Sequence, residues 1–146
     1  MAAIRVEVTG NGRSRLAELL KAVGKLNAPM PRRVLTQMAG DVLVDKAKEC
    51  FASRSSPFGD PWAPLQNEDH SPLVRTGKMY KSIRNESVDG AIVLVDSAPY
   101  ASYQNSGTRH IPARPFLPTA ARGMPRSWSM AAGLVVARAV AKAVGQ

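Results

Sequence analysis

The placement of glycine and proline between Ser97 and Ala121 constrains this chain more than any other feature. The stretch is SAPYASYQNSGTRHIPARPFLPTAA. Gly107 follows a short run that a helix can occupy, and glycine commonly ends a helix in a left-handed conformation. Pro112, Pro115 and Pro118 then keep the chain extended, because each proline also disfavours helix at the residue before it. We therefore expect a short helix followed by an extended segment.

The side chains of this stretch favour a contact surface over an active site. Ser97 is a suitable N-cap for the short helix. Pro99 would lie in the first turn, where the missing N–H of proline costs nothing because an N–H there has no partner within the helix. The stretch also carries five aromatic or basic residues that we take as candidate subunit or partner contacts: Tyr100, Tyr103, Arg109, Arg114 and Phe116.

Length and composition predict one domain that spans residues 1–146. The chain has 45% hydrophobic residues and a mean hydropathy of -0.17, which is ordinary for a soluble globule. Cys50 is its single cysteine, so no internal disulfide is expected and a reducing compartment suits it. The N-terminus lacks the apolar run of a signal peptide, and we expect no membrane association.

Periodicity predicts an α+β fold with a small antiparallel sheet. Residues 3–9 alternate between apolar and polar side chains, as a half-buried strand does. Asp89-Gly90 is a type I′ turn signal, so a central hairpin is expected. Residues 91–95 form its second strand, apolar throughout and therefore covered on both faces. The first strand of the hairpin, about residues 82–88, alternates poorly.

Helices are predicted to pack on this sheet. An amphipathic helix is expected from Ser14, and a longer one from about Arg32 to Ala52. A short helical turn is expected after Gly77. A last helix ends near Val144. Its apolar residues repeat at four- and three-residue intervals, and this stripe packs either inside the subunit or against another copy. The stripe consists of Met130, Leu134, Ala137, Ala141 and Val144, and it is widened by Val136 and Val140.

Residues 53–75 are predicted to form an extended proline-rich loop or arm. Such a long irregular segment within a domain is usually functional. Phe58, Trp62 and Leu65 are apolar residues in this loop and complete our set of candidate contacts. Two interpretations of Trp62 remain open, because it can fold back onto its own core or dock on a neighbouring subunit.

The sequence offers no candidate catalytic, cofactor-binding or metal-binding residue. His70 and His110 lie in proline-flanked loops without the spacing of a zinc site. No nucleophile elbow, P-loop or dinucleotide fingerprint is present. We therefore expect that the protein is not an enzyme and needs no cofactor.

The net charge of +9 favours an acidic partner, which nucleic acid or an acidic protein surface can supply. Residues 97–146 carry six basic and no acidic side chains. No predicted helix has a basic face dense enough to enter a DNA groove. A basic nucleic-acid-binding module nevertheless stays open as an alternative function.

Four segments follow one another in a fixed order: GDPWAPL at 59–65, RTGKMYKSI at 75–83, VDSAPYASYQNSGT at 95–108 and IPARPFL at 111–117. Together they resemble the virion-morphogenesis, tail-completion family of Mu-like tailed phages. The likeness covers about residues 30–121, and the ordered set is more specific than any one segment.

This resemblance implies a non-enzymatic structural protein of the head–tail junction or tail end. It implies an α+β fold and assembly into a homo-oligomeric ring, often hexameric, that contacts other neck or tail proteins. It also implies location in the virion, with the host cytoplasm as the place of assembly, and basic residues that face neighbours or genome DNA in a lumen. An assembly factor that is not retained in the virion is the other alternative.

Overall fold

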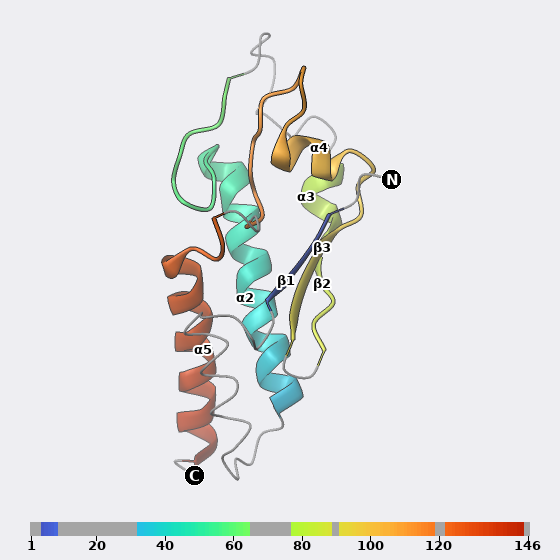
Figure 1. The fold of residues 1–146 in the computed structure, drawn as a ribbon. Helices are drawn as coiled ribbons and strands as arrows, with labels where there is room; N and C mark the ends of the chain where they lie inside the picture. The colour runs from blue at the N-terminus through green and yellow to red at the C-terminus, as the bar shows by residue number, and fades with distance from the viewer. Residues whose placement is uncertain (1–3, 9–31, 65–76, 89–90, 119–121, 145–146) are drawn as a thin grey trace.

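The computed structural model describes residues 4–8, 32–64, 77–88, 91–118 and 122–144. These residues form an α+β fold, as predicted, in which a small sheet and a second long helix pack on one central helix (Figure 1). The elements in chain order are β1 (Ile4–Val8), α2 (Arg32–Ser53), α3 (Lys78–Ser82), β2 (Ile83–Asn85), β3 (Ile92–Asp96), α4 (Ala101–Ser106) and α5 (Arg126–Val144). The amphipathic helix expected from Ser14 lies outside the described residues.

The sheet is antiparallel, with strand order β1-β3-β2. Ile4 and Ile83 both pair with Asp96, one on each side of the central strand. All five residues of β3 are buried, but the strand begins one residue later than predicted and ends with Asp96, beyond the apolar run. The strand before the turn is shorter than predicted: β2 ends at Asn85, and only the isolated Val88–Ala91 bridge continues the pairing.

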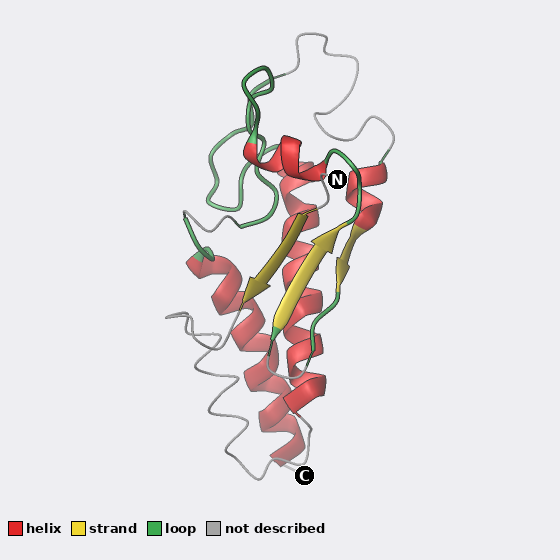
Figure 2. Cartoon of the chain, turned by 45° about the vertical axis from the view of Figure 1, so that its right-hand side comes forward, coloured by secondary structure: helices red, strands yellow, loops and turns green. Residues whose placement is uncertain are grey.

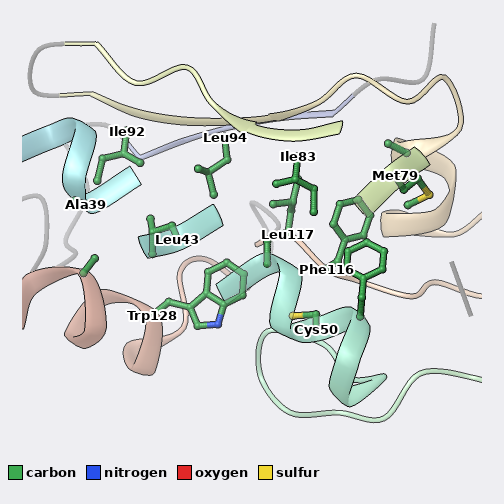
Figure 3. Close-up of a cluster of buried hydrophobic side chains, with 14 of the residues drawn as sticks. Ala39, Leu43, Cys50, Met79, Ile83, Ile92, Leu94, Phe116, Leu117 and Trp128 are labelled. Atoms are coloured by element: carbon green, nitrogen blue, oxygen red, sulfur yellow. The ribbon is translucent and has the colours of Figure 1, made fainter. Parts of the chain in front are cut away.

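The core lies between α2 and one face of the sheet. α2 has the predicted apolar face, because Leu35, Ala39, Leu43, Ala47 and Phe51 are all buried. Figure 3 shows Ile92 and Leu94 of β3 facing this helix, with Phe116 and Leu117 closing the cluster beside Cys50. The repeat of these apolar side chains at four-residue intervals thus predicted which side of α2 is internal.

The packing of the last helix shows which of its apolar side chains are internal. α5 packs along α2, and it does so through Trp128, Ala132 and Val136. The main row of the predicted stripe faces away from the core, since Met130 is 57% and Leu134 51% exposed, whereas Val136, which widens the stripe, is buried. The physical reason is that α5 is apolar nearly all round, so spacing alone could not say which stripe is internal. The large Trp128 ring and the small Ala132 side chain favour the observed side.

The start of α4 also differs from the prediction. Ser97 does not cap this helix: its Oγ accepts a hydrogen bond of 3.4 Å from Nη1 of Arg84 instead. α4 begins after Tyr100 without a side-chain cap. Its end is as predicted, because Gly107 has φ of 75° and its N–H donates to the carbonyl of Tyr103 at 2.8 Å.

The close approach of β2 to α2 depends on Gly40 and gives a first prediction. A Cβ at Gly40 would overlap the Asn85 side chain. That side chain donates 2.9 Å hydrogen bonds to the carbonyl of Gln37 and to Oδ1 of Asp41. We expect Gly40→Ala to lower the free energy of unfolding by about 1–3 kcal/mol in urea titrations, because it displaces these bonds.

The control is the same substitution in an Asn85→Ala background. There the overlap is absent, and alanine's helix propensity is expected to make Gly40→Ala stabilising by up to about 1 kcal/mol. Stabilisation by Gly40→Ala in the otherwise unchanged chain would contradict the overlap.

Candidate contact surface

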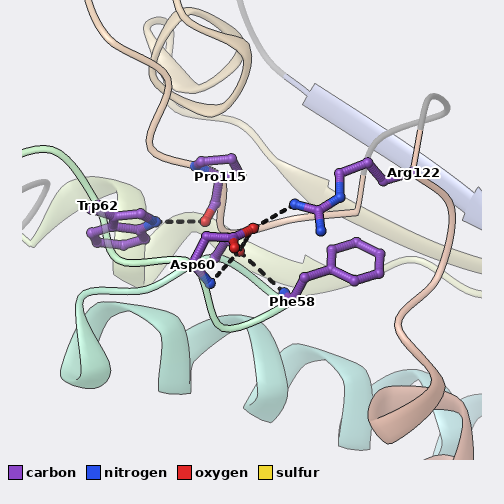
Figure 4. Close-up of polar contacts among 6 residues, drawn as sticks. Phe58, Asp60, Trp62, Pro115 and Arg122 are labelled. Carbon is purple, nitrogen blue, oxygen red and sulfur yellow. Dashed lines mark hydrogen bonds and ion pairs between the residues drawn. The ribbon is translucent and has the colours of Figure 1, made fainter.

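The loop after α2 folds back onto its own subunit through Trp62. This ring is only 7% exposed and meets Phe51 edge-on at 5.5 Å between centroids. Its Nε1 donates a 2.7 Å hydrogen bond to the carbonyl of Pro115, as Figure 4 shows. Of the two interpretations of Trp62, the structure therefore supports the one in which it belongs to its own core.

Arg114 makes the second connection between the same two segments. Its side chain is buried, and its Nε donates to the carbonyl of Ala63 at 2.8 Å while Nη2 donates to that of Pro64 at 3.2 Å. Its backbone N–H donates to the carbonyl of Gln104 at 2.8 Å. Because proline-rich segments lack a regular hydrogen-bond ladder, a guanidinium with several donors can satisfy their carbonyls.

Asn105 holds the extended segment against α4. Its buried Oδ1 accepts hydrogen bonds of 2.9 Å from the backbone N–H groups of both Phe116 and Leu117. Gly107 allows the chain to return closely, since a Cβ there would lie 2.8 Å from the backbone nitrogen of Ala113. Residues 107–118, which we call the strap, are thereby joined to α4 through the backbone of Arg114, Phe116 and Leu117.

Three predicted contact residues are consequently internal in this structure. Trp62, Arg114 and Phe116 are buried within the subunit, where they join the loop, the strap and α2. Aromatic rings and arginine suit a contact between subunits and an irregular interior equally well, because both need large apolar area and many donors. Residue type therefore could not separate the two roles.

The other predicted contacts remain at the surface, apart from Leu65, which lies outside the described residues. Tyr103 is 51% exposed, and Tyr100 and Arg109 are also exposed. Phe58 is 38% exposed, and the guanidinium of Arg122 lies 4.0 Å from its ring centroid. Phe58 belongs to the loop after α2, whereas the two tyrosines belong to α4 and the residue just before it.

Arg122 also ties the loop to the segment before α5. Its Nη1 lies 2.6 Å from Oδ2 of Asp60 (Figure 4). The hydrogen bond from Arg122, and then its charge, hold the pKa of Asp60 below its usual value. Both side chains are exposed, so this ion pair adds little to stability.

The sequence leaves the stripe that contains Met130 and Leu134 open between packing inside the subunit and packing against another copy. Because Trp128 occupies the inner side of α5, these two side chains point outward and are available for a contact with another chain. Val88, which is 61% exposed beside β2, was missed as a contact candidate. Nothing in the sequence singles out a lone valine next to a turn.

Cys50 has the environment expected of a small buried hydrophobe. Burial raises the pKa of its thiol to about 12, and its Sγ donates to the carbonyl of Lys46 at 3.6 Å. A thiol with such a pKa carries almost no thiolate near neutrality. Among the described residues, no group of three or more His, Cys, Asp or Glu side chains could hold a metal ion. Within the same ranges, no helix is long and apolar enough to span a bilayer.

Asp96 is a fully buried carboxyl group at the end of β3. Its Oδ1 accepts a 3.0 Å hydrogen bond from the backbone N–H of Ala98, and its Oδ2 has no partner among the described residues. Burial raises the pKa of Asp96 to about 6, although the Ala98 N–H and the charge of Arg84 oppose the rise. The charged form is therefore a source of instability at neutral pH.

Comparison with known proteins adds no relative. The chain matches no family model, no curated protein and no solved structure. Its likeness to the phage tail-completion family consequently rests on the four sequence segments alone.

The position of Trp62 gives a second prediction. We expect Trp62→Ala to lower the free energy of unfolding by about 3–5 kcal/mol, because a buried indole and its hydrogen bond are lost. Phe58→Ala is the matched control in the same loop, and we expect it to cost less than about 1 kcal/mol. Urea unfolding measures both, and a Trp62→Ala protein as stable as Phe58→Ala would contradict the internal position.

The buried carboxyl of Asp96 gives a third prediction. Since the pKa rises from 3.8 to about 6 on folding, the native protein loses about 3 kcal/mol of stability as pH increases through this window. Asp96→Asn keeps the oxygen that accepts from Ala98 and removes the charge. We expect the variant to be more stable than the parent at pH 7.5, with the difference disappearing near pH 4. Parallel pH profiles for the two proteins would refute this.

Proposed function

We propose that this chain is a non-enzymatic structural protein of a phage virion, at the head–tail junction or the tail end. It acts through protein–protein contacts as a subunit of a homo-oligomeric ring. The proposal includes other neck or tail proteins as neighbours and the virion as its location, with assembly in the host cytoplasm.

One observation carries the proposal: the four segments behind the family resemblance interlock in space. Trp62 of the first segment binds Pro115 of the fourth. Asn105 of the third binds the backbone of Phe116 in the fourth. Tyr80 of the second packs edge-on against Phe51 at 5.6 Å, and Phe51 in turn contacts Trp62 and Phe116. Segments that depend on one another for folding are expected to occur together and in a fixed order, so the ordered set has a physical basis.

The exposed side chains are consistent with a protein that works through contacts. Large apolar side chains at the surface include Tyr103, Met130, Leu134 and Val88. Aromatic residues and methionine are enriched at protein interfaces relative to the rest of a surface. Contacts with other chains would remove this apolar area from water.

Native mass spectrometry of the purified chain, together with proteomics of particles purified from the same source, tests the proposal. We expect a closed ring of defined copy number in solution and the same chain in the particles. A strict monomer that is absent from particles would refute the structural role.

The alternative of a nucleic-acid-binding module makes a different prediction. It requires tight DNA binding whose logarithm falls linearly with the logarithm of salt concentration, with a slope that reports several ion pairs. Under our proposal, DNA binding is weak and indifferent to sequence.

A further inference from the structure

α5 is apolar on two opposite sides, and only one of them meets the core. The inner side packs on α2 through Trp128, Ala132 and Val136. The outer side, here called the outer α5 seam, consists of Met130, Leu134, Ala137 and Ala141, all exposed. Their four- and three-residue spacing places them in one row along the helix. A surface helix usually has a single apolar stripe, so this second row needs a partner.

Basic side chains border the seam. Arg138 and Lys142 are exposed and lie one turn apart beside it. Neither has an ion-pair partner within the described part of the chain. Since residues 97–146 contain no Asp or Glu, α5 of one copy cannot neutralise α5 of another. The partner surface must therefore carry carboxylates that lie on a different element.

The flank of the domain formed by α2 and β2 has the complementary chemistry. Asp41 and Asp45 are exposed one turn apart on α2, and among the described residues neither forms an ion pair. Val34 is exposed on the same side of α2. The 2.9 Å hydrogen bond from Asn85 to Asp41 places β2, and after it the exposed Val88, beside this row. We call Val34, Asp41, Asp45 and Val88 the α2–β2 flank.

We propose that the outer α5 seam of one copy docks on the α2–β2 flank of a second copy. Met130 and Leu134 would cover the exposed valines, and Arg138 and Lys142 would face Asp41 and Asp45. Figures 1 and 2 both show α5 on one side of α2 and β2 on the other, so the two surfaces are on different sides of the domain. A contact between two different surfaces repeats head to tail, and it closes into a ring if the rotation permits. The inference rests on the ring of the proposed function and names the surfaces that form it.

Cross-linking between singly substituted chains tests which surfaces meet. Leu134→Cys copies are mixed with Val88→Cys copies and treated with a short bifunctional maleimide. We expect cross-linked dimers that contain one chain of each kind. Tyr103→Cys is the matched control for Leu134→Cys, because both positions are 51% exposed, and it should give no cross-link with Val88→Cys. The native Cys50 is buried and adds no background.

Charge exchange tests the polar part of the contact. We expect Arg138→Glu and Asp45→Lys each to weaken assembly about tenfold or more, measured as the concentration at which half the chains are assembled. The double variant in one chain restores the opposite charges across each contact and should recover most of the affinity. All three chains should remain folded, since both side chains are exposed.

Each of the other possible results would refute the proposed interface, and each would indicate a different arrangement. Leu134→Cys chains that cross-link only to one another would show a symmetric pairing of α5 with α5. A cross-link within one chain between Leu134→Cys and Leu20→Cys, without any between chains, would show that the N-terminal segment covers the seam. A ring that forms normally with Arg138→Glu would refute this interface and leave the proposed function standing, whereas a strictly monomeric parent chain would refute both.

Discussion

Two hydrogen bonds to one amide oxygen hold the rest of this structure in place. Oδ1 of Asn105 accepts from the backbone N–H groups of Phe116 and Leu117, which are buried residues of the proline-rich strap and have no strand partner. An unpaired buried N–H would cost about 1–3 kcal/mol each. With these bonds made, Phe116 reaches Phe51, and the carbonyl of Pro115 is presented to Trp62. The loop, the strap and the central helix thus form one interior.

Because this interior contains several of the predicted contact residues, it limits which side chains can contact other chains. The segments that resemble the phage tail-completion family contain Trp62, Arg114 and Phe116, and all three side chains are buried within the subunit. Contacts with other chains must then use the side chains that remain exposed at the surface. The outer side of α5 is a row of exposed apolar side chains with basic residues at its border, whereas the flank of α2 and β2 carries carboxylates.

Periodic features of the sequence predicted the fold well, and irregular ones did not. The buried face of α2 follows from a regular contrast between apolar and polar positions, and the fully buried β3 follows from a continuous apolar run. α5 lacks that contrast, so only packing against α2 decides its inner side. The role of Asn105 could not be predicted, since it bridges residues eleven and twelve positions away across irregular structure. The same limit applied to Trp62, for which two positions fitted the sequence equally.

Hydrogen exchange at the backbone amides of Phe116 and Leu117 tests the central claim most directly. If the strap belongs to the interior through Asn105, both amides exchange as slowly as those of β3, close to the rate set by global unfolding. Asn105→Ala should then accelerate exchange at these two amides more than in β3. Rapid exchange at Phe116 and Leu117 in the unsubstituted chain, comparable to exposed loop amides, would contradict this account.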